Sequence, residues 1–114
     1  ALSSLLEVLC DVVVDLDQNL VMKEHCPKLA IMLMQSASTS TQGCAFSDIL
    51  AGGEDQRSFE QIVVSSADQG ADLSPSVFSI NVRDSVGNSI RTVVHHIPYR
   101  NIVGHVHHLV GLSE

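Results

Sequence analysis

Residues 78–94, FSINVRDSVGNSIRTVV, carry the clearest structural pattern in the chain. Apolar Phe78, Ile80 and Val82 alternate with polar neighbours, which is the two-residue period of a strand that buries one face. The polar segment DSVGNS predicts a turn, and the residues after it predict a second strand that ends before Pro98. Residues 101–114, NIVGHVHHLVGLSE, predict a third strand. The chain is therefore expected to end in three consecutive antiparallel strands.

The first half of the chain changes period several times. Leucines at i, i+3, i+4 and i+7 predict a short amphipathic helix over residues 1–10, and an apolar–acidic alternation then begins a hairpin over residues 11–25. Pro27 opens a short helix, and residues 54–69 predict the longest helix from apolar side chains at helical spacing. This order predicts an α+β fold, with a five-stranded antiparallel sheet, short helices on one face and an N-terminal amphipathic helix.

Composition narrows the class of protein. A chain of 114 residues fits one domain, here residues 11–114, preceded by the flanking helix of residues 1–10. A net charge of −7 with six scattered lysines and arginines argues against nucleic-acid binding, and no apolar run approaches the roughly 20 residues of a membrane span. Three cysteines without a metal-binding or disulfide spacing favour a reducing, cytoplasmic location.

Five segments, in this order, resemble those of PAS domains. They are LLEVLCDVVVDLDQNLVM (5–22), GCAFSDIL (43–50), EDQRSFEQIV (54–63), FSINVRDSVGNSIRTVV (78–94) and IVGHVHHLVGLSE (102–114). The ending departs from the family, which often closes with Asp-Ile-Thr where this chain has GLSE. The resemblance implies a sensory and protein-interaction module of a larger signalling protein. Some members hold haem, flavin or a metabolite between the sheet and the helices, and many hold nothing.

The residues do not indicate a particular cofactor. Cys44 and Phe46 copy the Cys-x-Phe of the flavin-binding branch, but Gly43 stands where that branch has asparagine, and the ring-binding neighbours are missing. Residues 54–69 contain no histidine for haem. No cofactor is predicted, and an unknown small ligand remains open. The side chains expected to line its pocket, which equally describe an ordinary core, are Val14, Leu16, Phe59, Ile62, Val63, Ile80, Val82, Val94, His96 and His108.

Five of the six histidines lie in the last two strands, and alternation divides them between the two faces of the sheet. His95, His105 and His107 are expected on the outer face, where three imidazoles could converge on zinc or copper. Solvated polar positions are the simpler reading of this trio, so no metal is predicted. His96 and His108 are expected on the inner face, as a hydrogen-bonded contact or as a pH-sensing pair.

The outer face also carries an apolar patch, which is a feature of interfaces. Val13, Val93 and Leu109 form this patch, and a leucine stripe is its expected cover: Leu2, Leu5, Leu6 and Leu9. The stripe comes either from a partner, giving a homodimer, or from the same chain. No catalytic residue is predicted, because the chain lacks the usual serine-hydrolase, P-loop and zinc-protease motifs. The predicted function is protein interaction and signal relay, with ligand sensing and metal binding as alternatives.

Overall fold

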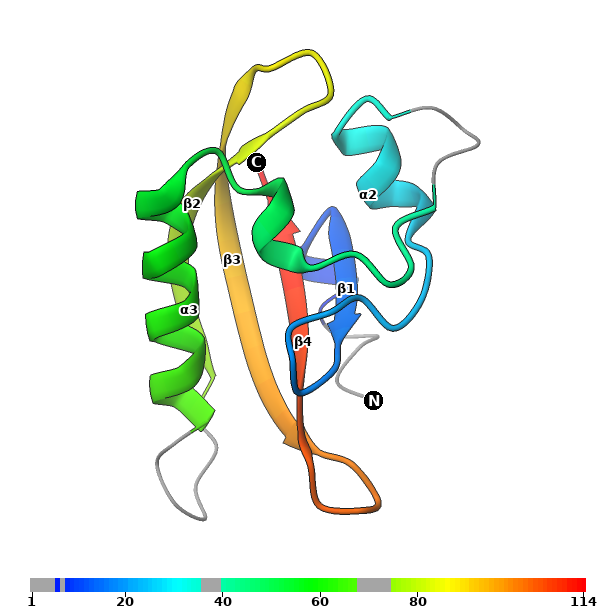
Figure 1. Ribbon diagram of the computed structural model, residues 1–114, viewed down its shortest axis with the longest axis vertical. Coiled ribbons are helices and arrows are strands. Elements are labelled where there is room, and N and C mark those ends of the chain that lie inside the picture. Colours follow the sequence, from blue (N-terminus) through cyan, green and yellow to red (C-terminus); the bar gives the residue numbers. More distant parts are fainter. Residues whose placement is uncertain (1–5, 7, 36–39, 68–74) are drawn as a thin grey trace.

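The computed structural model describes residues 6, 8–35, 40–67 and 75–114, and these form one antiparallel sheet with helices against one face (Figure 1). The strands follow the order β1-β4-β3-β2 across the sheet. They are β1 (Val12–Leu16), β2 (Ser76–Arg83), β3 (Ser89–Arg100) and β4 (Val106–Ser113). The helical elements are α2 (Pro27–Met32), the 3-10 turn η1 (Phe46–Ile49) and α3 (Gly53–Ala67). The α+β architecture with helices on one face is as predicted.

The β2–β3 hairpin follows the alternation of the sequence. Phe78 pairs with Val94 and Val82 with Ile90, so apolar side chains of both strands share the inner face. The turn is held by Asp84, whose Oδ1 accepts hydrogen bonds from the backbone N–H groups of Val86 (3.1 Å) and Asn88 (2.8 Å). These bonds explain why a polar segment reverses the chain at this point.

The described sheet has four strands, so the prediction of five is wrong. The residues expected to form the missing strand make only the isolated bridges Leu16–Met22 and Val21–Ala45. Asp17 accepts hydrogen bonds from Asn19 N–H and Val21 N–H, and this tight turn leaves few residues before Pro27 begins α2. The segment after the turn therefore forms isolated bridges instead of a continuous ladder.

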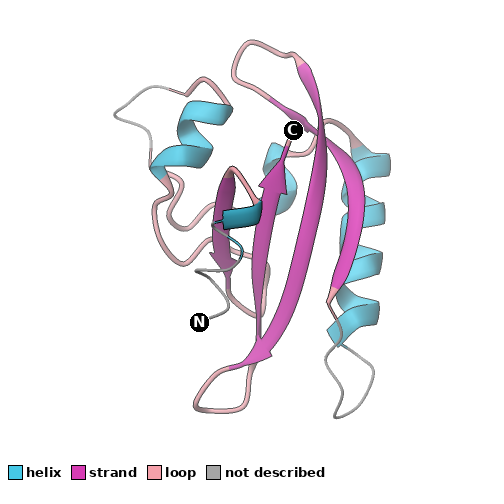
Figure 2. Cartoon of the chain, turned by 180° about the vertical axis from the view of Figure 1, so that it is seen from behind, coloured by secondary structure: helices cyan, strands magenta, loops and turns pink. Residues whose placement is uncertain are grey.

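The predicted N-terminal amphipathic helix falls largely on residues that the structure does not describe. Residues 1–5 and 7, and with them Leu2 and Leu5, lie outside the described residues. Residues 6, 8 and 9 have helical backbone, and Cys10 N–H donates to Leu6 O at 2.7 Å. This N-terminal segment (residues 6 and 8–10) lies across β1 and β4 on the face of the sheet away from α3, as the view from behind shows (Figure 2).

The core lies between the inner face of the sheet and the helices. Phe59 of α3 is fully buried, with its ring centroid 4.6 Å from that of Phe46 in η1 and 6.1 Å from that of Phe78 in β2. Most side chains proposed to line a ligand pocket are buried in this same cluster: Val14, Leu16, Phe59, Val63, Ile80, Val82 and Val94. These residues therefore build the hydrophobic core, whereas Ile62 is only half-buried.

The prediction that the second strand of the hairpin ends before Pro98 is also wrong, because β3 continues through Pro98 to Arg100. The pairing of β2 with β3 begins at Ser76, opposite His96, so among the described residues no strand pairs with that side of β3 beyond His96. A proline without an N–H is tolerated at an edge, where no neighbour needs the missing hydrogen bond. The extra length brings the end of β3 alongside the start of β4.

Candidate functional site

The register of β3 and β4 brings two buried histidines together on the inner face. His96 is opposite Val110, and His108 is opposite Pro98, so the two imidazoles are diagonal neighbours. His96 Nε2 lies 2.8 Å from His108 Nδ1, and the rings are stacked with centroids 5.0 Å apart. The structure thus places in contact the two histidines that alternation assigned to the inner face. We refer to them below as the histidine pair.

Burial keeps the histidine pair uncharged at neutral pH. Desolvation lowers the pKa of His96 to about 4, and the charge of His108 acts in the same direction. Desolvation also lowers the pKa of His108, with a contribution from His107, while Asp17 and Asp15 act in the opposite direction. His96 Nδ1 is buried and has no hydrogen-bond partner among the described residues. The pair is therefore a buried polar site beside the hydrophobic core.

A cleft of about 290 Å³ opens beside His108. Its walls come from the turn after β1, the C-terminal half of α3 and the start of β4: Gln18, Leu20, Val63, Val64, His105, Val106 and His108. His108 is buried, whereas Gln18 and His105 are exposed. The sequence predicted Val63 and His108 as ligand-lining residues. It did not predict the other lining residues, of which Val64 is adjacent to Val63 and Val106 lies two residues before His108 in β4, whereas Gln18 and Leu20 come from the distant turn after β1.

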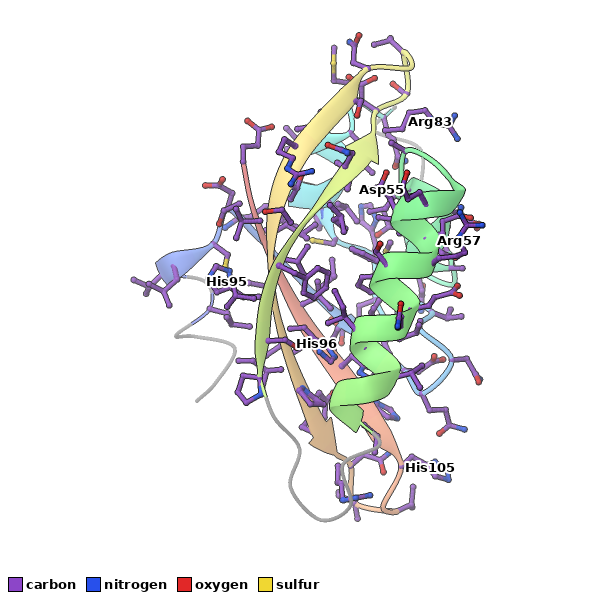
Figure 3. The ribbon with its side chains drawn as sticks, turned by 90° about the vertical axis from the view of Figure 1, so that its left-hand side faces the viewer. Asp55, Arg57, Arg83, His95, His96 and His105 are labelled. Atoms are coloured by element: carbon purple, nitrogen blue, oxygen red, sulfur yellow. The ribbon has the colours of Figure 1, made fainter. Side chains whose placement is uncertain are left out.

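The outer histidines do not converge. His95 is opposite Gly111 and contacts Cys10, His105 is exposed in the turn before β4, and His107 Nε2 lies 3.1 Å from Asn101 Nδ2. Figure 3 shows His95 and His96 on opposite sides of the sheet and His105 at its far end. Within the described part of the chain, no three His, Cys, Asp or Glu side chains are placed to hold a metal ion. The pairing register separates the trio considered for zinc or copper.

The outer face is partly covered by the chain itself. Leu6, Cys10 and Leu109 form a small buried cluster, against which Val13, Ile97 and Tyr99 pack. Cys10 occupies the space above Gly111, where a Cβ atom would lie 2.6 Å from its sulfur. Of the predicted interface residues, Leu6 and Leu109 are thus buried within one molecule, whereas Leu9 remains 60% exposed. The sequence predicted that leucines cover this face, but it did not predict that Gly111 leaves the space in which Cys10 packs.

Gly111→Ala is expected to destabilise the domain by about 1–3 kcal/mol, because the added methyl group displaces Cys10 and Leu6 from the sheet. Urea denaturation of the single variant measures the loss. Adding Cys10→Ala removes the clashing sulfur and should recover much of the stability. Equal losses in Gly111→Ala and in the double variant would show that this contact does not control the docking of the N-terminal segment.

Comparison by sequence identifies no relative, since neither a family model nor a curated protein matches the chain. Comparison of structures finds many neighbours. The PAS domain of an HTR-like protein from Haloarcula marismortui is 16% identical to this chain and has a TM-score of 0.66. The match covers 98% of this chain and 90% of that domain. A PAS domain from Desulfitobacterium hafniense is 9% identical, with coverages of 97% and 98% and a TM-score of 0.70.

A third neighbour is the N-terminal domain of a diguanylate cyclase with a PAS/PAC sensor from Marinobacter aquaeolei. It is 14% identical, covers 89% of this chain and 90% of its own, and has a TM-score of 0.65. Among the described helices, none has the length and apolar character to cross a bilayer. The structural neighbours agree with this chain over nearly its whole length, and the five sequence segments stand in the order typical of PAS domains. This chain has the fold of a PAS domain.

Proposed function

We propose that the chain is a signal-relay module that associates with a second copy of itself through the outer face of the sheet. The observation that carries the proposal is the apolar surface left uncovered there. Val8 is 82% exposed, Leu9 60% and Val77 64%, and the half-buried Val93 lies in the same face. An apolar surface that gathers on one face favours an interface.

The fold supports this role. One structural neighbour is a PAS domain from a two-component sensor histidine kinase, and another belongs to a diguanylate cyclase with a PAS/PAC sensor. By analogy, we propose that residues 11–114 form the PAS domain of a longer signalling protein and that residues 1–10 flank it. The proposed location is inside the cell, where its three free cysteines would remain reduced. The proposal invokes binding and relay rather than a chemical reaction.

One side of the N-terminal segment packs on the sheet through Leu6, and the other side is exposed. The side chain of Leu6 is buried against Leu109 of the same molecule, so the exposed side presents Val8 and Leu9 to a partner. Fully burying a valine or leucine contributes roughly 1.5–3 kcal/mol, and a symmetric interface buries each residue twice. Association costs about 4–15 kcal/mol in lost freedom. A dimer of modest affinity is therefore expected.

Val8→Glu combined with Leu9→Glu is expected to convert a dimer into a folded monomer, because it places two charges in the proposed seam. Sedimentation equilibrium at high micromolar concentration measures the association state. Both side chains are exposed, so the melting temperature should change little. The matched control is Ile102→Glu with Val103→Glu, two similarly exposed residues in the β3–β4 turn, which should leave the dimer intact. A wild-type protein that remains monomeric would restrict the N-terminal segment to an intramolecular cover.

A further inference from the structure

The cleft beside His108 combines apolar walls with one buried polar side chain. Leu20, Val63, Val64 and Val106 supply the apolar surface. The volume of about 290 Å³ corresponds to roughly ten water molecules at about 30 Å³ each. Pockets of this kind use a few placed polar groups to orient a small occupant. His108 is such a group, because it is the buried polar residue in the wall.

The histidine pair determines what His108 offers to an occupant. A neutral imidazole carries one N–H, and the pair shares a proton between His96 Nε2 and His108 Nδ1. If that proton belonged to His108, His96 would carry its N–H on the buried Nδ1, which has no partner among the described residues. Protein interiors tolerate an unpaired acceptor better than an unpaired N–H. His96 Nε2 is therefore the donor, and His108 holds its proton on Nε2, the ring nitrogen left for the cleft.

Charge narrows the chemistry of the occupant. The pair is uncharged, so the cleft provides no buried cation for a carboxylate, and Asp15 and Asp17 act electrostatically on His108. The whole chain has a net charge of −7. A cation would be attracted by the acidic groups, but the N–H of His108 offers it no acceptor. An uncharged hydrogen-bond acceptor pairs with the N–H of His108 and is not repelled by the negative charge of the protein.

We propose that this cleft binds a small uncharged carbonyl compound with a short branched apolar body, whose oxygen accepts a hydrogen bond from His108 Nε2. The branched body packs against Val63, Val64 and Val106. The cleft includes residues of α3 and therefore lies on the helix side of the sheet, opposite the surface proposed for self-association. The binding site and the dimer are therefore tested separately, and either can fail without the other.

Isovaleramide is the probe, because it is uncharged and carries a carbonyl group on a branched four-carbon chain. Its titration is followed at about pH 7.5, above the ordinary pKa of histidine, by NMR of the valine methyl groups and the histidine ring nitrogens. We expect saturable shifts at Val63, Val64, Val106 and His108 Nε2, with a Kd of about 1–10 mM for so small a molecule. Isovalerate, which has the same shape and a negative charge, should bind at least about tenfold more weakly.

Val64→Arg provides the matched loss of function. Val64 borders the cleft but is 57% exposed, so arginine fills the entrance without disturbing the core, and binding should weaken at least about tenfold. Val86→Arg places the same side chain in the exposed β2–β3 turn and should leave binding unchanged. The proposal is overturned if the cleft methyl groups do not respond to isovaleramide, if isovalerate binds equally well, or if Val64→Arg binds like wild type.

Discussion

Phe59→Ala is expected to lower the free energy of unfolding by about 3–5 kcal/mol. Phe59 is fully buried between α3 and the sheet, and its ring contacts Phe46 and packs near Phe78. Removing the ring leaves a cavity at the point where helix, 3-10 turn and hairpin meet. Chemical denaturation measures the loss, and the slope with denaturant should stay unchanged because the fold is retained.

The matched control for Phe59→Ala lies little more than one turn further along the same helix. Val64→Ala removes an exposed side chain from α3 and is expected to change stability by less than about 0.5 kcal/mol. A loss below about 1 kcal/mol for Phe59→Ala would show that α3 does not pack on the sheet through this residue. That outcome would also remove the wall that α3 contributes to the cleft.

Acidification from pH 7.5 to pH 5 is expected to destabilise the domain by about 2 kcal/mol through His96 alone. The pKa of His96 is about 4 in the folded protein and near 6.5 in the unfolded chain. The unfolded chain therefore binds more protons below pH 6.5, and stability falls as the pH drops from 6.5 towards 4. The lowered pKa of His108 acts in the same direction. Denaturation curves at several pH values measure the slope.

A double variant isolates the contribution of the histidine pair from that of the carboxyl groups. Replacing both partners of a buried hydrogen bond by apolar groups can be nearly neutral, so His96→Leu with His108→Leu should retain the fold and flatten the slope between pH 6.5 and 5. His95→Gln, on the opposite face of the sheet, serves as the control and should retain the wild-type slope. Identical slopes in wild type and the double variant would mean that the pair does not govern the acid response.

The cleft and the acid response share one physical origin. A histidine pair inside an apolar core is costly when charged, so it stays neutral and presents a fixed donor to the cleft. The outer face instead carries exposed apolar side chains, two valines and a leucine, which we propose are buried by a partner. The two proposed binding sites therefore lie on opposite faces of one sheet.

Alternation along the sequence was sufficient to predict the faces of the strands. Residues of a strand point to opposite sides with a period of two, so the amino-acid sequence alone assigns His96 and His108 to the inner face and His95 and His107 to the outer face. The core residues of β2 and β3 follow from the same local rule, as do Phe59 and Val63 from helical spacing. The five PAS-like segments add the order of the elements.

Only the tertiary structure decided which of these side chains meet. Register between strands depends on distant packing and on the turn that joins them, and here it places His96 beside His108 while it separates His95 from His107. The turn at Asp17 leaves a bridge where a fifth strand was expected, and the open side of Gly111 receives Cys10 from far along the chain. A sequence pattern indicates whether a side chain lies on the buried or the exposed face of its own element, whereas contacts between distant segments arise from the packing of the whole domain.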